Sequence, residues 1–169
     1  MAGKPRAVPD TNVFVSGLIN PRGFPAAILK ALRSGQFTLL SSPPINEEII
    51  EVLNRPRLRD RYGLGDRIFD VSFILWEVAE LVIDLPDVRV CSNPDDDKFL
   101  ATAAGGRADY LVTGDVGHLL HLREYKGVAI ISPRDYGKRS SKIETRKSDK
   151  LNREFRVSNF DFRQRATDR

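Results

Sequence analysis

Residues 108–115 read Ala-Asp-Tyr-Leu-Val-Thr-Gly-Asp, a short apolar run with an acid directly after it. Tyr110–Thr113 has the length and the apolar character of a buried β-strand, and Asp115 lies just beyond its carboxyl end. The same arrangement occurs near the start of the chain, where Arg6–Val8 predicts a brief strand that ends at Asp10. Both strands are thus predicted to carry an aspartate at the same end.

Short apolar runs alternate with helical patterns along most of the chain. Further strands are predicted at Phe37–Leu40, Val88–Cys91 and Val128–Ser132, and helices at Pro25–Ser34, Pro43–Leu53, Asp66–Val82 and Pro94–Ala104. Strands separated by helices favour parallel pairing, because the crossover helix returns the chain to the edge from which it started. We therefore predict an α/β fold with a central parallel sheet covered by helices on both faces.

The longest helical pattern, Asp66–Val82, is apolar on two sides. Ile68, Val71 and Leu75 follow one another at helical spacing on one side. Aromatic side chains form the second side, namely Phe69, Phe73 and Trp76. A helix with two apolar faces is buried twice, within its own domain or against a second copy of the chain. The aromatic face is therefore a candidate contact for a homodimer.

Carboxylates follow four of the predicted strands. They are Asp10, Glu48, the run Asp95–Asp97, and Asp115. Because the carboxyl ends of parallel strands meet at one edge of a sheet, these acids are expected to converge. Carboxylates held close together repel, and a hard divalent ion such as Mg²⁺ or Mn²⁺ relieves the repulsion through oxygen ligation. Such a site suits phosphodiester cleavage, because the ion makes water a better nucleophile and offsets charge on the phosphate.

Each acid also has a purely structural interpretation. Acids are enriched in first helical turns, where they cap free N–H groups, and this applies most to Asp95. Within its helix, Glu48 borders the apolar arc at about 100° per residue, whereas Glu51 is predicted to face solvent. The same angular argument does not separate Asp96 from Asp97, so the choice between them stays open on geometry alone.

The basic excess of the chain lies at its end. The 169 residues include 27 Lys and Arg against 23 Asp and Glu, for a net charge of +4. Lys138–Arg169 carries +6, and the preceding 137 residues carry −2. We predict one folded domain over residues 1–137 and a basic, flexible tail over residues 138–169 that could contact RNA phosphates.

The sequence argues against a membrane span and against a cysteine-based site. Its longest run without a charge, Ser34–Asn46, has 13 residues and contains two prolines. Cys91 is the single cysteine, which excludes an internal disulfide framework and a cysteine-rich zinc site. For the two histidines, His118 and His121, orienting or surface roles are commoner than metal ligation. We expect a cytoplasmic protein.

Four segments, in this order along the chain, resemble the motifs of PIN-domain ribonucleases. They are Asp10-Thr-Asn12, Glu48–Arg57, Asp97-Lys-Phe-Leu-Ala-Thr-Ala103 and Ala108–Asp115. The run Ile130-Ile-Ser-Pro133 adds to the likeness with one branch of this family, the toxin components of toxin–antitoxin systems. The resemblance covers Arg6–Tyr136.

This resemblance implies a three-layer α/β/α fold, a homodimer and a metal-dependent endoribonuclease that uses Mg²⁺ or Mn²⁺. The catalytic and metal-binding acids of the family correspond here to Asp10, Glu48, Asp97 and Asp115. The family acid stands three residues before an aliphatic–Ala pair, which favours Asp97 over Asp96. The implied supporting polar groups are Thr11, Asn12 and Thr113, with Asp96 as a further contributor.

Arginines cluster directly after the helix that carries Glu48. Arg55, Arg57 and Arg59 are candidates for contacts with the RNA backbone, because an acidic pocket needs a basic rim to hold phosphates. A solvated loop explains the same cluster equally well.

The sequence therefore predicts a Mg²⁺- or Mn²⁺-dependent endoribonuclease, the toxin of a type II pair with RNA as substrate and a cognate antitoxin as partner. One alternative is a PIN-type RNA-processing nuclease without a toxin role, and a neighbouring antitoxin gene would discriminate between the two. The other alternative is a non-catalytic module that binds RNA or protein. Metal titration and a cleavage assay decide that question.

Overall fold

The structure is a computed structural model that describes residues 3–140. The chain divides into two compact units, Met1–Asp135 and Tyr136–Arg169. The sheet and all the site residues discussed below belong to the first unit. Of the predicted tail, residues 141–169 lie outside the described residues.

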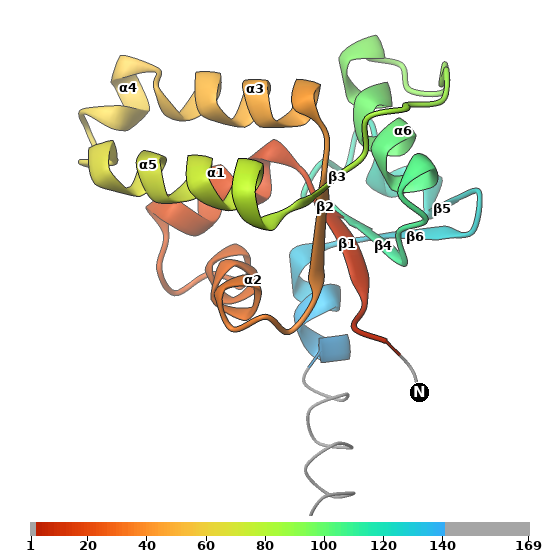
Figure 1. Ribbon diagram of the computed structural model, residues 1–169, viewed down its shortest axis with the longest axis horizontal. Coiled ribbons are helices and arrows are strands. Elements are labelled where there is room, and N and C mark those ends of the chain that lie inside the picture. The colour runs from red at the N-terminus through yellow and green to blue at the C-terminus, as the bar shows by residue number, and fades with distance from the viewer. Residues whose placement is uncertain (1–2, 141–169) are drawn as a thin grey trace, which may run out of the picture. The chain divides into compact units, whose positions relative to one another are not determined.

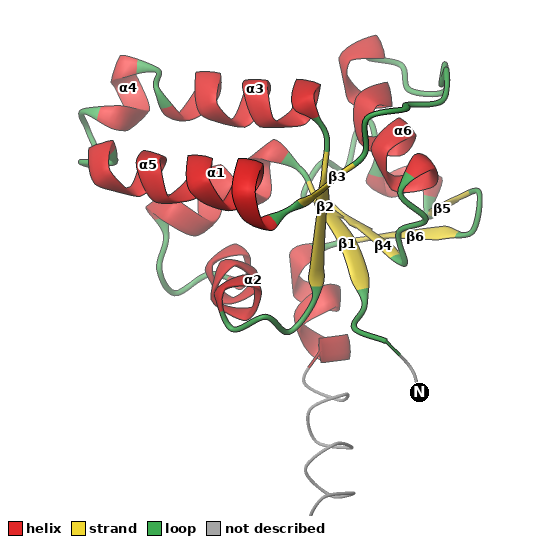
Figure 2. Cartoon of the chain, in the orientation of Figure 1, coloured by secondary structure: helices red, strands yellow, loops and turns green. Residues whose placement is uncertain are grey.

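A six-stranded sheet with the order β3-β2-β1-β4-β6-β5 forms the centre of the first unit (Figures 1 and 2). Its strands are β1 (Arg6–Pro9), β2 (Thr38–Ser41), β3 (Glu80–Leu81), β4 (Tyr110–Val112), β5 (Glu124–Tyr125) and β6 (Val128–Ile131). All neighbours pair in parallel except β5, which runs antiparallel to β6. The predicted α/β fold with a central parallel sheet is confirmed.

Helices cover both sides of this sheet. They are α1 (Thr11–Ile19), α2 (Phe24–Arg33), α3 (Pro43–Leu53), α4 (Pro56–Arg59), α5 (Gly65–Phe73) and α6 (Asp97–Gly105). Figure 1 shows α1, α2, α3 and α5 gathered on one side of the strands and α6 on the other. Residues 133–140 are also helical. Among the described residues, no helix is both long and apolar enough to cross a membrane.

The two central strands are the most deeply buried part of the sheet. Ala7 and Val8 of β1, and Leu111 and Val112 of β4, are fully buried. The two strands pair over three residues, and the Asp10 N–H extends the ladder by donating to the Val112 carbonyl at 2.9 Å. The acid that follows β1 is therefore anchored to the neighbouring strand by its own backbone.

The prediction of a β-strand at Val88–Cys91 is wrong. The structure assigns no strand to these residues. The backbone N–H groups of Val90 and Cys91 instead donate to Asp97 Oδ1, at 3.0 and 2.8 Å. A side chain thus takes the place of a sheet partner for this segment.

The predicted helix Asp66–Val82 ends before Val82. After α5, one π-helical turn spans Ile74–Val78, and the chain then becomes extended at Ala79 and enters β3. Buried Asn46 of α3 donates from Nδ2 to the Leu75 carbonyl at 2.9 Å, which ties the π-turn to the domain. Helical periodicity alone did not indicate this stop, since apolar residues continue through it.

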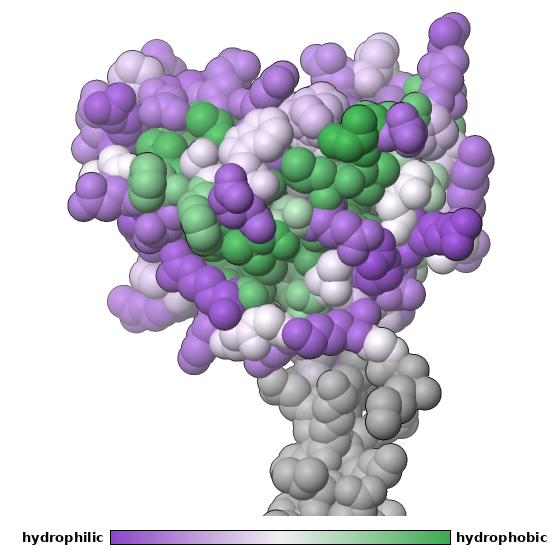
Figure 3. Space-filling model, viewed as in Figure 1, coloured by the Kyte–Doolittle hydropathy of each residue, from purple (hydrophilic) through white to green (hydrophobic). Residues whose placement is uncertain are grey.

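The two faces of α5 and the following turn differ in exposure. Ile68, Val71 and Leu75 are buried, as predicted for the inner face. The aromatic side chains of the other face are exposed, with relative exposures of 76% for Phe69, 56% for Phe73 and 40% for Trp76. Figure 3 shows hydrophobic residues gathered on this side of the molecule, over α5 and β3.

Candidate active site

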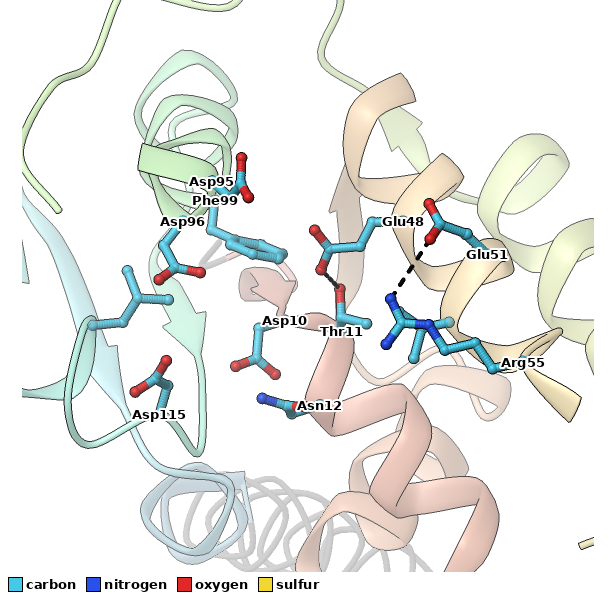
Figure 4. Close-up of a pocket in the computed structure, with 12 residues that line it drawn as sticks. Asp10, Thr11, Asn12, Glu48, Glu51, Arg55, Asp95, Asp96, Phe99 and Asp115 are labelled. Atoms are coloured by element: carbon cyan, nitrogen blue, oxygen red, sulfur yellow. Dashed lines mark hydrogen bonds and ion pairs between the residues drawn. The ribbon is translucent and has the colours of Figure 1, made fainter. Parts of the chain in front are cut away.

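An open cleft of about 430 Å³ lies at the carboxyl end of the central strands. Its walls come from the start of α1, from α3, from the start of α6 and from the loop after β4 (Figure 4). The lining residues are Asp10, Thr11, Asn12, Glu48, Glu51, Val52, Arg55, Asp95, Asp96, Phe99, Asp115 and Leu119. Six of these twelve side chains are acids and one is basic, so the cleft favours a cation.

Asp10 is the most deeply buried acid of the cleft, with a relative exposure of 3%. It is the N-cap of α1, where Oδ1 accepts the Val13 N–H at 2.9 Å. Its other oxygen accepts the hydroxyl proton of Thr113. Burial raises the pKa of Asp10 to about 6, against the lowering effect of the hydrogen bonds from Thr113 and Val13.

Asp115 lies in the turn after β4, and local hydrogen bonds orient its carboxylate. Oδ1 accepts the N–H groups of Gly117 and His118, at 2.9 and 3.0 Å. Oδ2 accepts from His118 Nδ1 at 2.9 Å. This hydrogen bond is the largest cause that lowers the pKa of Asp115 and raises that of His118. The carboxylate is therefore held ionised and directed by its own turn.

Asp96 carries an oxygen for which the described residues offer no hydrogen bond. Its Oδ2 is buried without a hydrogen-bond partner and lies 3.7 Å from His118 Nδ1. Burial raises the pKa of Asp96, and the charge of Asp115 raises it further. One ligand atom each from Asp96, Asp115 and His118 lie within 4.8 Å of one another. An unpaired carboxylate oxygen facing further acids fits a bound divalent cation.

Asp97 does not line the cleft. It is buried, and its Oδ1 accepts the N–H groups of Val90 and Cys91. Burial, the largest single effect, raises the pKa of Asp97, but the backbone N–H groups of Cys91 and Val90 together with the Cys91 side chain outweigh it, and the net effect is a lowered pKa. In the structure Asp96 faces the other acids, whereas the Asp97 carboxylate contacts the backbone of Val90 and Cys91. The choice of Asp97 over Asp96 as the functional acid stays a prediction.

Glu48 reaches the cleft from α3, as predicted, but both of its oxygens are already engaged. Thr11 donates its hydroxyl proton to Oε1, and the ammonium group of Lys98 forms an ion pair with Oε2. We did not predict this contact of Lys98 from the sequence. The available signal was its place directly after three aspartates, which makes it the nearest cation to the acidic run.

The remaining predicted residues divide between the cleft and its surroundings. Asn12 and Arg55 line it, while Arg57 and Arg59 do not. Glu51 is exposed, as predicted, at the open cleft, and Arg55 forms an exposed ion pair with it at 3.5 Å. His118, to which the sequence assigned an orienting or surface role, contacts two of the acids.

Thr113 connects two of the acids directly. Its hydroxyl donates to Asp10, and the same oxygen accepts the Asp115 N–H at 2.9 Å. Thr113 is fully buried, so this link is shielded from water. The supporting role that the motif resemblance implies for Thr113 stays a prediction.

Comparison with known proteins agrees with this arrangement. A family model described as "PIN domain" matches residues 6–117. An uncharacterized protein of Methanocaldococcus jannaschii is 35% identical over 121 residues, which cover 72% of this chain and 77% of that protein. The residues matched by the family model include β1 and all the acids of the cleft. The chain therefore belongs to the PIN domain family, whose members are typically nucleases.

Proposed function

We propose that this protein is a Mg²⁺- or Mn²⁺-dependent endoribonuclease that hydrolyses phosphodiester bonds of RNA. The observation that carries the proposal is the buried Oδ2 of Asp96, which accepts no hydrogen bond from the described residues, in a cleft that also contains Asp10 and Asp115. Leaving a buried carboxylate oxygen without a hydrogen bond is costly, and a divalent cation compensates that cost. Membership of the PIN domain family supports nuclease chemistry at this cleft.

Asp10, Asp96 and Asp115 would hold the ion, with His118 and Glu48 at its edge. When bound, the ion supplies Lewis-acid chemistry that activates water and stabilises charge on the phosphate. Asp97, which we predicted as a ligand, has a positioning role in this proposal because its carboxylate holds the backbone of Val90 and Cys91.

The other polar groups of the cleft hold the acids in place. Thr113 keeps Asp10 and Asp115 in a fixed relation, and Thr11 orients Glu48. His118 donates from Nδ1 to Asp115, which prevents that carboxylate from rotating. Second-layer hydrogen bonds of this kind typically change metal affinity or activity by about 10–100-fold.

Basic side chains near the cleft are suited to holding the RNA backbone. Arg55 lines the cleft, and Arg57 and Arg59 follow on α4. Contacts of this type position the strand without reading its sequence. Basic residues of the tail, most of which lie outside the described residues, would add salt-sensitive affinity.

The experiment that tests the proposed function is cleavage mapping on total cellular RNA. The wild-type protein is expected to cleave RNA internally in the presence of Mg²⁺ or Mn²⁺ and to show no cleavage in EDTA. The variant Asp10→Asn, measured with the same ions, is the control for a contaminating ribonuclease. Cleavage that persists in EDTA or in Asp10→Asn would overturn the proposed mechanism.

We further propose that this ribonuclease acts in the cytoplasm as the toxin of a type II toxin–antitoxin pair, as a homodimer with a cognate antitoxin partner. The support is the likeness of Asp97–Ala103, Ala108–Asp115 and Ile130–Pro133 to the toxin branch of the family. Induced expression in a bacterial host should arrest growth with the wild type and not with Asp10→Asn. Normal growth with an enzyme that cleaves RNA in vitro would favour the RNA-processing alternative.

A further inference from the structure

We propose that the ammonium group of Lys98, which does not itself line the cleft but pairs with the lining residue Glu48, takes the place of a second metal ion at the edge of the cleft. The cleft would then bind one divalent cation and use Lys98 as a fixed second positive charge beside the RNA phosphate. This inference rests on the proposed nuclease function and concerns how the positive charge at that site is divided between a bound ion and Lys98.

The acids of the cleft fall into two groups. In the first group, Asp96 has an oxygen without a hydrogen-bond partner, and it lies with Asp115 and His118 where a cation fits. In the second group, on α3, side-chain cations of the protein itself already neutralise the acids. Lys98 pairs with Glu48, and Arg55 pairs with Glu51. Only the first group therefore needs an ion from solution.

The Glu48–Lys98 pair differs from the Glu51–Arg55 pair in its surroundings. The side chains of Lys98 and Glu48 have relative exposures of 18% and 30%, against 60% and 75% for Arg55 and Glu51. A partly buried pair is screened less by water and salt than an exposed one. Lys98 should therefore compete more effectively than Arg55 with an ion from solution for the carboxylate that it pairs with.

Two contacts hold the ammonium group of Lys98 in position. Glu48 Oε2 lies against it, and the ring of Phe99 lies 5.3 Å away, within range of a cation–π interaction. Glu48 is in turn fixed by the Thr11 hydroxyl. An ammonium group has three protons, and Glu48 is its one acceptor among the described residues, so two protons remain for phosphate oxygens. The group is therefore placed to serve both Glu48 and a substrate phosphate.

The test is the number of Mn²⁺ ions bound, measured by equilibrium dialysis and by electron paramagnetic resonance in the absence of RNA. The wild type is expected to bind one ion. Lys98→Met keeps the apolar stem but removes the charge, which frees Glu48 as a ligand, and two ions with a broadened spectrum are expected. The double variant Lys98→Met with Glu48→Gln should return to one ion.

Three further variants complete the design. Glu48→Gln alone should still bind one ion, because Glu48 is occupied by Lys98 in the wild type. Arg55→Met is the matched control, since it removes the cation that pairs with the other acid of α3, Glu51, and should leave one ion bound. Lys98→Gln repeats the expectation for Lys98→Met with a polar side chain, and circular dichroism establishes that each variant is folded.

Two ions in the wild type, one ion in both folded Lys98 variants, or no ion in Glu48→Gln would each overturn the inference. These outcomes are separate from the nuclease assay. A protein with the expected Mn²⁺ pattern that does not cleave RNA would refute the proposed function alone. A wild type that cleaves RNA and binds two ions would refute the role of Lys98 alone.

Discussion

Thr113 and Asp10 are 103 positions apart in the sequence and are joined by a buried hydrogen bond from the threonine hydroxyl to Asp10 Oδ2. The bond crosses from the end of β4 to the end of β1, the two central strands of the sheet. It partly offsets the cost of burying the Asp10 carboxylate, whose pKa is nonetheless raised to about 6. The site is thus held together by the strands that the acids follow, and it carries a buried charge that the folded protein tolerates poorly without a cation.

Asp10 should make the metal-free protein less stable as the pH rises. Its pKa is about 6 in the folded state, against an ordinary value of 3.8, so the folded state binds the proton more tightly than the unfolded state does between these two pH values. The contribution of Asp10 to the free energy of unfolding is therefore fully present below about pH 4 and is lost as the pH rises through about 6. The loss amounts to about 1–3 kcal/mol. Other acids titrate in the same range, so the difference between the wild type and Asp10→Asn isolates this contribution.

Urea unfolding of both proteins in EDTA, at about pH 4 and about pH 7, measures that difference. Asp10→Asn should gain stability relative to the wild type at the higher pH, although it has lost cleavage activity. Saturating Mg²⁺ should reduce or reverse the gain, because the ion stabilises the wild-type carboxylate. A difference that does not vary with pH would contradict this account.

Asp96→Asn should lose activity but keep its stability, whereas Asp97→Ala should lose stability but keep its activity. Asp96→Asn removes a charge from the cation site, so cleavage should fall by about 100-fold or more while the melting temperature is maintained. Asp97→Ala removes the acceptor for the Val90 and Cys91 N–H groups and should cost about 1–3 kcal/mol of stability. Its cleavage activity should survive at temperatures where it is folded.

Single-turnover cleavage and thermal unfolding of these two variants provide the comparison. If Asp97→Ala were stable and inactive while Asp96→Asn retained activity, the assignment taken from the motif resemblance would be correct. The orientation of Asp97 in the structure would then not be the functional one.

Thr113→Val should weaken ion binding most strongly at low pH. Valine has the same shape as threonine but lacks the hydroxyl that donates to Asp10 and accepts from the Asp115 N–H. Loss of the donated bond raises the pKa of Asp10 further, so protons compete with the ion up to a higher pH. Mn²⁺ affinity should fall by about 10–100-fold, with the pH midpoint of binding shifted upward. Thr113→Ser keeps the hydroxyl and should restore both values.

The exposed aromatic face beside α5 should mediate the proposed homodimer. Phe69 and Phe73 are exposed in the single chain, so replacing both by serine should dissociate the dimer and change monomer stability little. Analytical ultracentrifugation measures the association. Val71→Ala, on the buried face of the same helix, is the control and should lower stability by about 1–3 kcal/mol without a specific effect on association. A wild-type protein that is monomeric at high concentration would remove the dimer proposal.

The local sequence was sufficient to predict the fold and the positions of most of the acids. Apolar runs such as Tyr110–Val112 and the acids directly after β1 and β4 could be located because strand length and chain order place them. Glu48 was placed on the correct side of its helix by its angle to the apolar arc, since that arc must pack on the sheet. These properties depend on neighbours within a few positions, which a sequence displays directly.

Only the tertiary structure decided which acid of the Asp95–Asp97 run faces the cleft and which cation pairs with Glu48. Adjacent residues at the start of a helix differ by about 100° in direction, so the choice depends on what packs around α6, and Asp97 is taken by the Val88–Cys91 segment. Lys98 meets Glu48 because α3 and α6 approach each other in space, although they are distant in the chain. An ion pair between residues so far apart in the chain produces no recognisable pattern in the sequence. The two side chains meet only because the helices that carry them pack together.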